Sequence, residues 1–259
     1  MSKKDHAIRD KFAADGSLGN CNQPKKEKIF QRRISRPLVF IGRSILAVVA
    51  LSVVIVLCLR WVPPPTSAFM LESYFARLFR GEKQTPIRYR WVNWKSISRH
   101  MPLAAVAAED QKFPQHWGFD FESIEEALMR NKKGMRLRGA STITQQVAKN
   151  LFLWSGRSYV RKGLEAYFTV LLELLWSKKR ILEVYLNIAE FGDNTYGVYA
   201  AAKTLLGKSP SELTKEEAAL LAAVLPNPKR LKVRAPSPYV MERARWIEKQ
   251  MEQMGRLDP

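Results

Sequence analysis

The sequence predicts a mostly α-helical domain attached to one membrane-spanning helix. The stretch 38–59 is apolar over a length that matches the thickness of a bilayer. From residue 97 onward, apolar residues recur at helical spacing almost throughout, with no sign of a parallel sheet. Helix start and stop signals also follow one another closely in this region. The 259 residues therefore suffice for one all-α domain with appendages.

The stretch 38–59, LVFIGRSILAVVALSVVIVLCL, has the character of a single-span anchor. Its one charge, Arg43, lies close enough to its start to reach the membrane surface. The tail 1–37 carries ten Lys and Arg against four acidic residues, so the positive-inside rule places it in the cytoplasm and everything after Pro65 outside. A cleaved signal peptide fits less well, because a long tail precedes the run and no small-x-small site follows it. A buried core helix is the other alternative.

The net charge of +19 indicates a polyanionic partner, which could be nucleic acid, an anionic membrane surface or a phosphorylated substrate. Two cysteines, Cys21 and Cys58, give no disulfide framework. Three scattered histidines and the lack of clustered cysteines give no zinc site. The sequence also has no glycine-rich phosphate loop.

The membrane-proximal segment 60–96 contains two short patterns. Ala68–Phe79 predicts an amphipathic helix, which could rest on the bilayer or pack on the domain. Ile87, Tyr89 and Trp91 alternate with arginines, as in a short strand. After residue 97, possible capping boxes and terminal glycines or prolines predict helices over 123–131, 142–153, 160–176, 178–191, 197–206, 214–226 and 237–255.

The segment 109–120, EDQKFPQHWGFD, places two carboxylates at the end of an apolar run. Aromatic residues and His116 crowd around Glu109 and Asp110. A carboxylate beside apolar walls has a raised pKa and can exchange a proton near neutral pH. Alternatively, the pair ends a helix in water.

The segment 138–153, RGASTITQQVAKNLFL, carries two different faces. Ile143, Val147 and Leu151 form an apolar stripe that predicts core packing. The opposite face has hydroxyls, amides and a lysine without an acidic partner, which favours an oxygen-rich, anionic ligand over a plain solvated surface. Its members are Ser141, Thr142, Gln145, Gln146 and Lys149.

The segment 155–168, SGRSYVRKGLEAYF, contains a cluster of charged residues. Arg161 and Lys162 lie one helical turn before Glu165, so the three project together. A surface salt bridge would explain them, but the apolar flanks predict a buried, central helix in which charges are costly. Arg157 adds another cation. Two carboxylates and a cation cluster together suggest sugar chemistry with a phosphate leaving group.

These segments, with KKRILEVYLNIAEFGDNTYGVYAAA and AALLAAVLPNP, resemble in residues and order the peptidoglycan glycosyltransferase (transglycosylase) family over about residues 101–228. The resemblance implies an all-α, lysozyme-like fold with a membrane-embedded jaw beside a deep cleft. Since the chain ends at Pro259 without an SxxK motif, we expect the monofunctional biosynthetic form, from a Gram-negative bacterium. The expected domains are a tail 1–37, an anchor 38–59, a linker 60–96 and a glycosyltransferase domain 97–259.

The resemblance also implies a reaction, the polymerisation of lipid II. Glu109 would be the general base that takes the proton from the 4-hydroxyl of the acceptor sugar. That oxygen would attack C1 of the lipid-linked growing chain, with inversion, and release undecaprenyl diphosphate. Glu165 would be the second catalytic glutamate, near the leaving group.

The resemblance also implies binding and structural roles for other residues. Residues that would neutralise the diphosphate are Lys149, Arg157, Arg161 and Lys162. Polar contacts of the donor site would be Ser141, Thr142 and Gln146. Asp110 and Phe113 would support the first motif, with His116 as a structural histidine, while Glu190 and Asn194 would shape the cleft.

No cofactor is required by this reading, and no dedicated metal ligands are visible. A divalent cation, Mg or Mn, that bridges Glu165 to the diphosphate is left open. Expected partners are lipid II, the lipid-linked chain, the membrane and other wall-synthesis or division proteins. Nucleic acid is not expected, because the anchor places the basic helices in the periplasm, outside the inner membrane. The rivals are a lytic transglycosylase or muramidase and an inactive scaffold.

Overall fold

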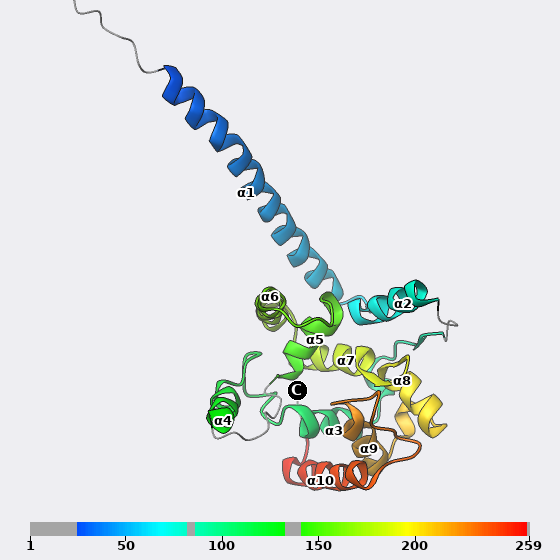
Figure 1. The fold of residues 1–259 in the computed structure, drawn as a ribbon. Coiled ribbons are helices and arrows are strands. Elements are labelled where there is room, and N and C mark those ends of the chain that lie inside the picture. The colour runs from blue at the N-terminus through cyan, green and yellow to red at the C-terminus, as the bar shows by residue number, and fades with distance from the viewer. Residues whose placement is uncertain (1–24, 82–85, 133–140, 258–259) are drawn as a thin grey trace, which may run out of the picture. The chain divides into compact units, whose positions relative to one another are not determined.

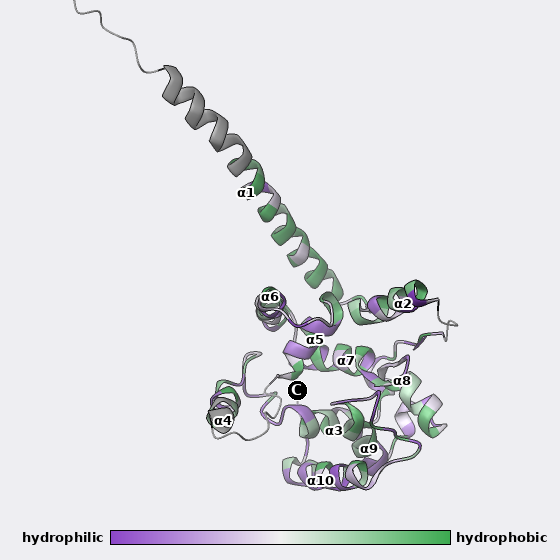
Figure 2. Cartoon of the chain, viewed as in Figure 1, coloured by the Kyte–Doolittle hydropathy of each residue, from purple (hydrophilic) through white to green (hydrophobic). Residues whose placement is uncertain are grey.

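The computed structural model describes residues 25–81, 86–132 and 141–257, and it divides after Ser52 into two parts that we treat separately. Within its described residues, the first part consists of α1 (Lys25–Leu59), which continues into the second. Figures 1 and 2 show this long helix and its apolar stretch. Val39–Leu59 has a mean hydropathy of 2.6, so its length and composition suit a membrane span, in agreement with the predicted anchor.

The second part is predominantly helical, which confirms the predicted fold class. Its longer helices are α2 (Ala68–Arg80), α3 (His100–Glu109), α4 (Phe121–Lys132), α5 (Ile143–Phe152), α6 (Tyr159–Leu175), α7 (Lys178–Ile188), α9 (Lys215–Val224) and α10 (Pro238–Met254). Shorter elements are β1 (Arg88–Tyr89), η1 (Trp94–Ser96), β2 (Glu190–Gly192), β3 (Thr195–Tyr196), α8 (Gly197–Ala201), the π-helical turn η2 (Ala202–Leu206) and η3 (Pro210–Glu212).

Three of the four predicted helix-start signals are confirmed. Thr142 and Thr214 each form a complete capping box, and Ser237 caps α10 ahead of a proline. The predicted box at Ser123 is wrong. Asp120 accepts the Ser123 N–H at 3.0 Å and its hydroxyl at 2.6 Å, so α4 begins two residues earlier than Ser123.

A small three-stranded sheet, in the order β1-β3-β2, corrects the expectation that no parallel pairing occurs. β1 pairs with β3 in parallel, and β2 pairs with β3 in antiparallel orientation. The helix predicted over 178–191 therefore ends at Ile188, because Glu190–Gly192 pairs in the sheet. Strands of two or three residues are too short for periodicity to distinguish them from a helix end.

The core lies around α3, which packs against α7, α9 and α10 (Figure 1). Alanines 104, 105 and 107 of α3 are buried, as are alanines 218, 219, 222 and 223 of α9. Small side chains on both helices let their backbones approach closely, and the packing excludes water from most of α3. The C-terminal end of α3 is thereby held rigidly, and that end carries Glu109.

The prediction that the helix of residues 160–176 is central and buried is wrong. Only Glu165, Thr169 and Leu172 of α6 are buried. Tyr159, by contrast, is 98% exposed and Val160 is 71% exposed. α6 thus buries one narrow strip, and several of its apolar side chains, among them Tyr159, Val160 and Leu174, are exposed.

α2 packs on the domain by one side. Glu72 accepts the N–H of Ser155 at 2.8 Å and also its hydroxyl, while Met70 is buried. The opposite side of α2 is exposed and apolar, with Phe79 at 85% exposure. The packing alternative for Ala68–Phe79 is therefore confirmed, and contact of the exposed side with a bilayer stays a prediction.

The last turn of α1 and the residues after it belong to the second part and are fastened to it. The indole N–H of Trp176 donates to the carbonyl of Val56 at 2.8 Å. The Arg180 guanidinium donates to the carbonyls of Leu59 and Val62, each at 2.9 Å. These carbonyls have no intrahelical partners at a helix end, so the domain satisfies them.

Two glycines with positive φ, Gly197 at the start of α8 and Gly207 after η2, test how closely the backbone packs against α7. Gly197 has φ +80°, and a Cβ there would meet the Asn187 carbonyl oxygen at 2.4 Å. Gly207 has φ +73° but open space around it. We expect Gly207→Ala to cost about 1 kcal/mol from backbone strain alone, and Gly197→Ala at least about 2 kcal/mol more. Denaturant unfolding of the detergent-solubilised protein measures both, and equal costs would contradict the close approach.

Candidate active site

Glu109 lies where three helices meet. It is the last residue of α3, and its Oε2 accepts a hydrogen bond from Nε2 of Gln146 on α5 at 2.7 Å. The hydroxyl of Tyr185 on α7 donates to the other end of that amide, Oε1 of Gln146, at 3.4 Å. The amide of Gln146 therefore fixes the orientation of the Glu109 carboxyl.

Burial raises the pKa of Glu109, and this is the largest influence on it. The hydrogen bond from Gln146 and the charges of Arg243 and Lys149 lower the pKa, while the charge of Asp110 raises it. The net direction is upward. A carboxyl in this setting can accept a proton at a pH closer to neutrality than an exposed glutamate.

Asp110 holds the end of α3 to the start of α5. Its Oδ2 accepts the backbone N–H of Ile143 at 2.9 Å, and its Oδ1 lies 2.8 Å from Nε2 of His116. The Phe113 ring is fully buried, and its centroid lies 6.3 Å from that of the His116 ring. Nζ of Lys178 lies 4.6 Å from the Phe113 centroid. Asp110 and His116 thus form a buried framework behind Glu109.

A compact cation cluster lies on α6. Glu165 is 3% exposed, and its two carboxylate oxygens bind Nη1 of Arg161 at 2.6 Å and Nζ of Lys162 at 2.5 Å. The predicted grouping of these three residues is confirmed. Because the carboxylate is fully engaged, it orients the two cations and leaves their outer donors for another anion.

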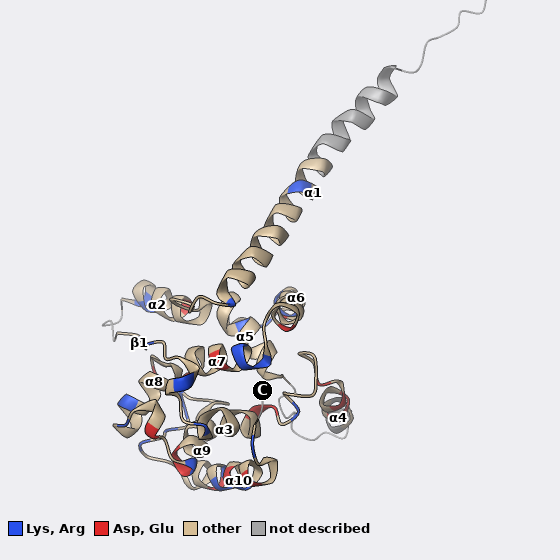
Figure 3. Cartoon of the chain, turned by 180° about the vertical axis from the view of Figure 1, so that it is seen from behind, with Lys and Arg blue, Asp and Glu red and all other residues tan. Residues whose placement is uncertain are grey.

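Lys149 of α5 connects the cluster electrostatically to Glu109. Burial lowers the pKa of Lys149, Glu165 and Glu109 raise it, and Arg161 and Lys162 lower it. Its Nζ lies 5.6 Å from the ring centroid of Phe69 on α2. Figure 3 shows basic segments on both α5 and α6. A half-buried cation among like charges is well placed to receive an anionic group.

Three further predicted binding residues are less closely joined to this group. The Thr142 hydroxyl donates to the Gly118 carbonyl at 2.6 Å and accepts the Gln145 N–H at 3.2 Å, so it is committed to local structure. Ser141 and Arg157 are exposed, and within the described part of the chain Arg157 forms no ion pair. Their contacts with a ligand stay predictions.

Glu190 is the first residue of β2, and Asn194 lies in the turn between β2 and β3. Asn194 adopts a left-handed conformation, φ 55°, and its carbonyl accepts the Arg88 N–H at 2.8 Å. Burial raises the pKa of Glu190. The sheet explains the position of both residues, and a role in shaping the cleft stays a prediction.

Two residues near Glu109 were missed by sequence reasoning. Tyr185 supports Gln146, as described above, and its position within KKRILEVYLN was the available signal. Arg243 of α10 donates from Nη2 to the Ala108 carbonyl at 2.9 Å and carries a charge that acts on Glu109. It lies well beyond the recognised segments, and only the packing of α10 on α3 reveals it.

The residues do not fit a metal bridge at Glu165. Both of its oxygens already bind cationic side chains, so a divalent ion would have to displace Arg161 or Lys162. Among the described residues, no three His, Cys, Asp or Glu side chains are grouped to hold an ion. We derive no step through a metal.

The framework of Asp110 is testable by stability. Asp110→Ala leaves the buried Ile143 N–H and His116 without their acceptor, and we expect a loss of about 2 to 4 kcal/mol in the free energy of unfolding. Asp193→Ala is the control, because its ion pair with Lys232 is exposed and should contribute less than about 0.5 kcal/mol. Similar losses in denaturant unfolding would show that Asp110 is not part of the framework.

Comparisons with known proteins identify the family of the chain. A transglycosylase family model matches residues 77–252. A biosynthetic peptidoglycan transglycosylase of Pseudomonas entomophila (strain L48) is 52% identical over 224 residues, covering 86% of this chain and 92% of the relative. The protein of that name from Shewanella oneidensis is 49% identical over 226 residues, covering 87% and 96%. The chain therefore belongs to the transglycosylase family.

Proposed function

We propose that this enzyme is a peptidoglycan glycosyltransferase that polymerises glycan strands from lipid II. It transfers the lipid-linked growing chain to the 4-hydroxyl of lipid II, with inversion, and releases undecaprenyl diphosphate. One observation carries the proposal. Glu109 is a half-buried glutamate oriented by Gln146, the cation cluster of α6 suits a diphosphate, and the charges of both influence the pKa of one lysine, Lys149.

Glu109 acts as the general base. The acceptor hydroxyl is a poor nucleophile until its proton moves to the carboxylate. The oxygen then forms a bond to C1 of the donor sugar as the bond from C1 to the phosphate oxygen breaks. Gln146 holds one carboxylate oxygen at 2.7 Å, which leaves the other oxygen for the proton.

The cations of α5 and α6 receive the leaving group. Negative charge develops on the diphosphate as the C1–O bond breaks, and Lys149, Arg161 and Lys162 compensate it. Glu165 acts through these cations. Its charge would repel a diphosphate directly, but its hydrogen bonds hold Arg161 and Lys162 in fixed positions. The reaction needs no cofactor.

The rival functions fit less well. A lytic transglycosylase or muramidase cleaves glycan with no charged leaving group, so the cation cluster would have no use. A scaffold without activity has no need of a base whose pKa is raised by burial and whose carboxyl is oriented by a relay of Gln146 and Tyr185.

The proposed location is the inner membrane, with the tail 1–37 in the cytoplasm and the domain from residue 97 in the periplasm. The excess of positive charge in the tail supports this orientation. A lipid-linked substrate also requires the site to stay close to the bilayer, which the anchor of α1 supplies. Other wall-synthesis proteins are the expected protein partners.

The base assignment is tested by fluorescent lipid II with the detergent-solubilised protein, with products resolved by length. We expect Glu109→Gln to lower the polymerisation rate at least about 100-fold, because the amide cannot accept the proton. Glu242→Gln, at an exposed position of α10, is the matched control and should polymerise normally. Shortening of labelled glycan by the wild type would favour the lytic rival, and binding without turnover would favour the scaffold.

A second prediction concerns pH. Four groups face Glu109, namely Gln146, Arg243, Lys149 and Asp110. Removing the charge of Arg243 takes away an influence that lowers the pKa of Glu109, so this pKa rises. Since the base must be ionised, we expect the acidic limb of the profile of kcat/KM against pH to move to higher pH in Arg243→Gln.

Arg245→Gln, on the exposed face of the same helix, should leave the limb in place. A loss of the hydrogen bond to Ala108 alone would lower kcat/KM at every pH without moving the limb. An unmoved limb in Arg243→Gln would therefore reduce Arg243 to a structural role.

A further inference from the structure

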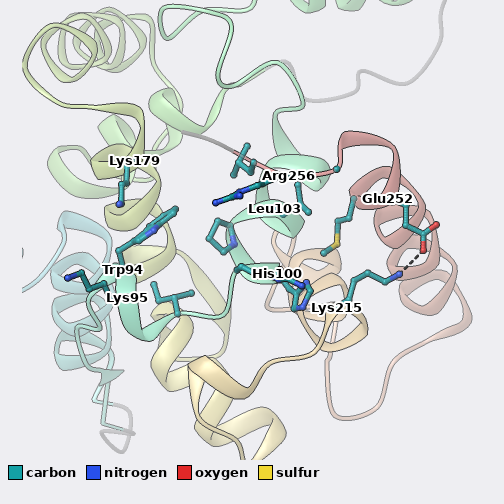
Figure 4. A pocket seen from close by; sticks show the side chains of 14 residues that line it. Trp94, Lys95, His100, Leu103, Lys179, Lys215, Glu252 and Arg256 are labelled. Carbon is teal, nitrogen blue, oxygen red and sulfur yellow. Dashed lines mark hydrogen bonds and ion pairs between the residues drawn. The ribbon is translucent and has the colours of Figure 1, made fainter.

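A hollow in the surface lies apart from the candidate active site. A pocket of about 870 Å³ opens between η1, the first half of α3, the start of α7 and the end of α10 (Figure 4). It shares no residue with the group around Glu109. His100 lines it at the start of α3, and Glu109 ends the same helix nine residues later, about 14 Å along the helix axis.

The pocket is strongly basic. Lys95, Arg99, Lys179 and Arg256 line it, and in the described ranges none of them forms an ion pair. The one acidic residue of the lining, Glu252, is neutralised by Lys215 at 2.6 Å. Like charges around a concave surface repel one another and focus a positive potential into the hollow, so an anion would relieve the repulsion.

The rest of the lining is apolar. Buried Ile97, Pro102 and Met251 lie with Leu103 and Leu257 in the wall, and Trp94 stacks with Lys179, whose Nζ is 5.5 Å from the ring centroid. Within the described residues, no Ser, Thr, Asn, Gln or Asp side chain lines the pocket. A sugar needs neutral donors and acceptors for its hydroxyls, so this chemistry favours an amphipathic anion over a glycan.

We propose that the pocket binds the carboxylate-bearing peptide of the peptidoglycan strand, an inference that rests on the proposed function. Several carboxylates on a short chain with small apolar side chains match the four cations and the apolar wall. The reach also fits. A peptide of four or five extended residues spans about 13 to 18 Å, comparable to the distance along α3 from Glu109 to the pocket.

Binding of soluble fragments tests this without turnover. The probes are a disaccharide that carries the peptide, the same disaccharide without it, and inorganic phosphate, each titrated against the full-length detergent-solubilised protein at low salt. The variant Lys95→Ala/Arg99→Ala removes two pocket cations. Its control, Arg245→Ala/Lys249→Ala, removes the same charge from the exposed face of α10.

We expect the pocket variant to bind the peptide-bearing disaccharide at least tenfold more weakly than the wild type, and the control variant to bind it within twofold of the wild type. The proposal is overturned if both variants bind alike, if the bare disaccharide binds as tightly, or if phosphate competes at equal concentration. Lipid II polymerisation by the same preparations separates the two claims. Pocket-dependent binding without polymerisation would defeat the proposed function alone, and polymerisation without such binding would defeat this inference alone.

Discussion

The hydrogen bond from the backbone N–H of Ile143 to the Asp110 carboxylate joins the two helices on which the site depends. A carboxylate at the first turn of a helix satisfies an unpaired N–H and lies favourably in the helix dipole. Because Asp110 directly follows Glu109, the same bond sets the distance from the base to Gln146, one turn into α5. The hydrogen bond between Asp110 and Ile143 therefore positions the charged face of α5. Lys149 on that face extends its influence to the cation cluster of α6.

Burial has opposite effects on the two halves of the site. It raises the pKa of Glu109, which suits a group that must accept a proton, and it lowers the pKa of Lys149, which weakens a cation. The nearby carboxylates of Glu109 and Glu165 partly offset the second effect. Glu165 is therefore best understood as a fixed counter-charge that allows three cations to gather before a substrate arrives.

The sequence predicted the helical class, the anchor and the capping boxes of Thr142 and Thr214 because each depends on local spacing. It also predicted the contact of Glu165 with Arg161 and Lys162, since residues three and four apart on a helix must meet. It failed where long-range packing decides. The exposure of α6, the sheet that ends α7 at Ile188 and the approach of Arg243 to Glu109 all depend on segments far apart in the chain. The apolar composition of α6 predicted burial, but the apolar side chains of its outer face are exposed.

The contacts of Trp176 and Arg180 with the end of α1 affect how the protein unfolds. Carbonyls of Val56, Leu59 and Val62 are acceptors for side chains of α6 and α7, so the final turn of the long helix is part of the domain's own hydrogen-bonded structure. A chain that began after Leu59 would leave the buried indole N–H of Trp176 without its acceptor, and Arg180 would keep only Val62 and Glu183. The end of α1 and the domain are therefore expected to unfold together.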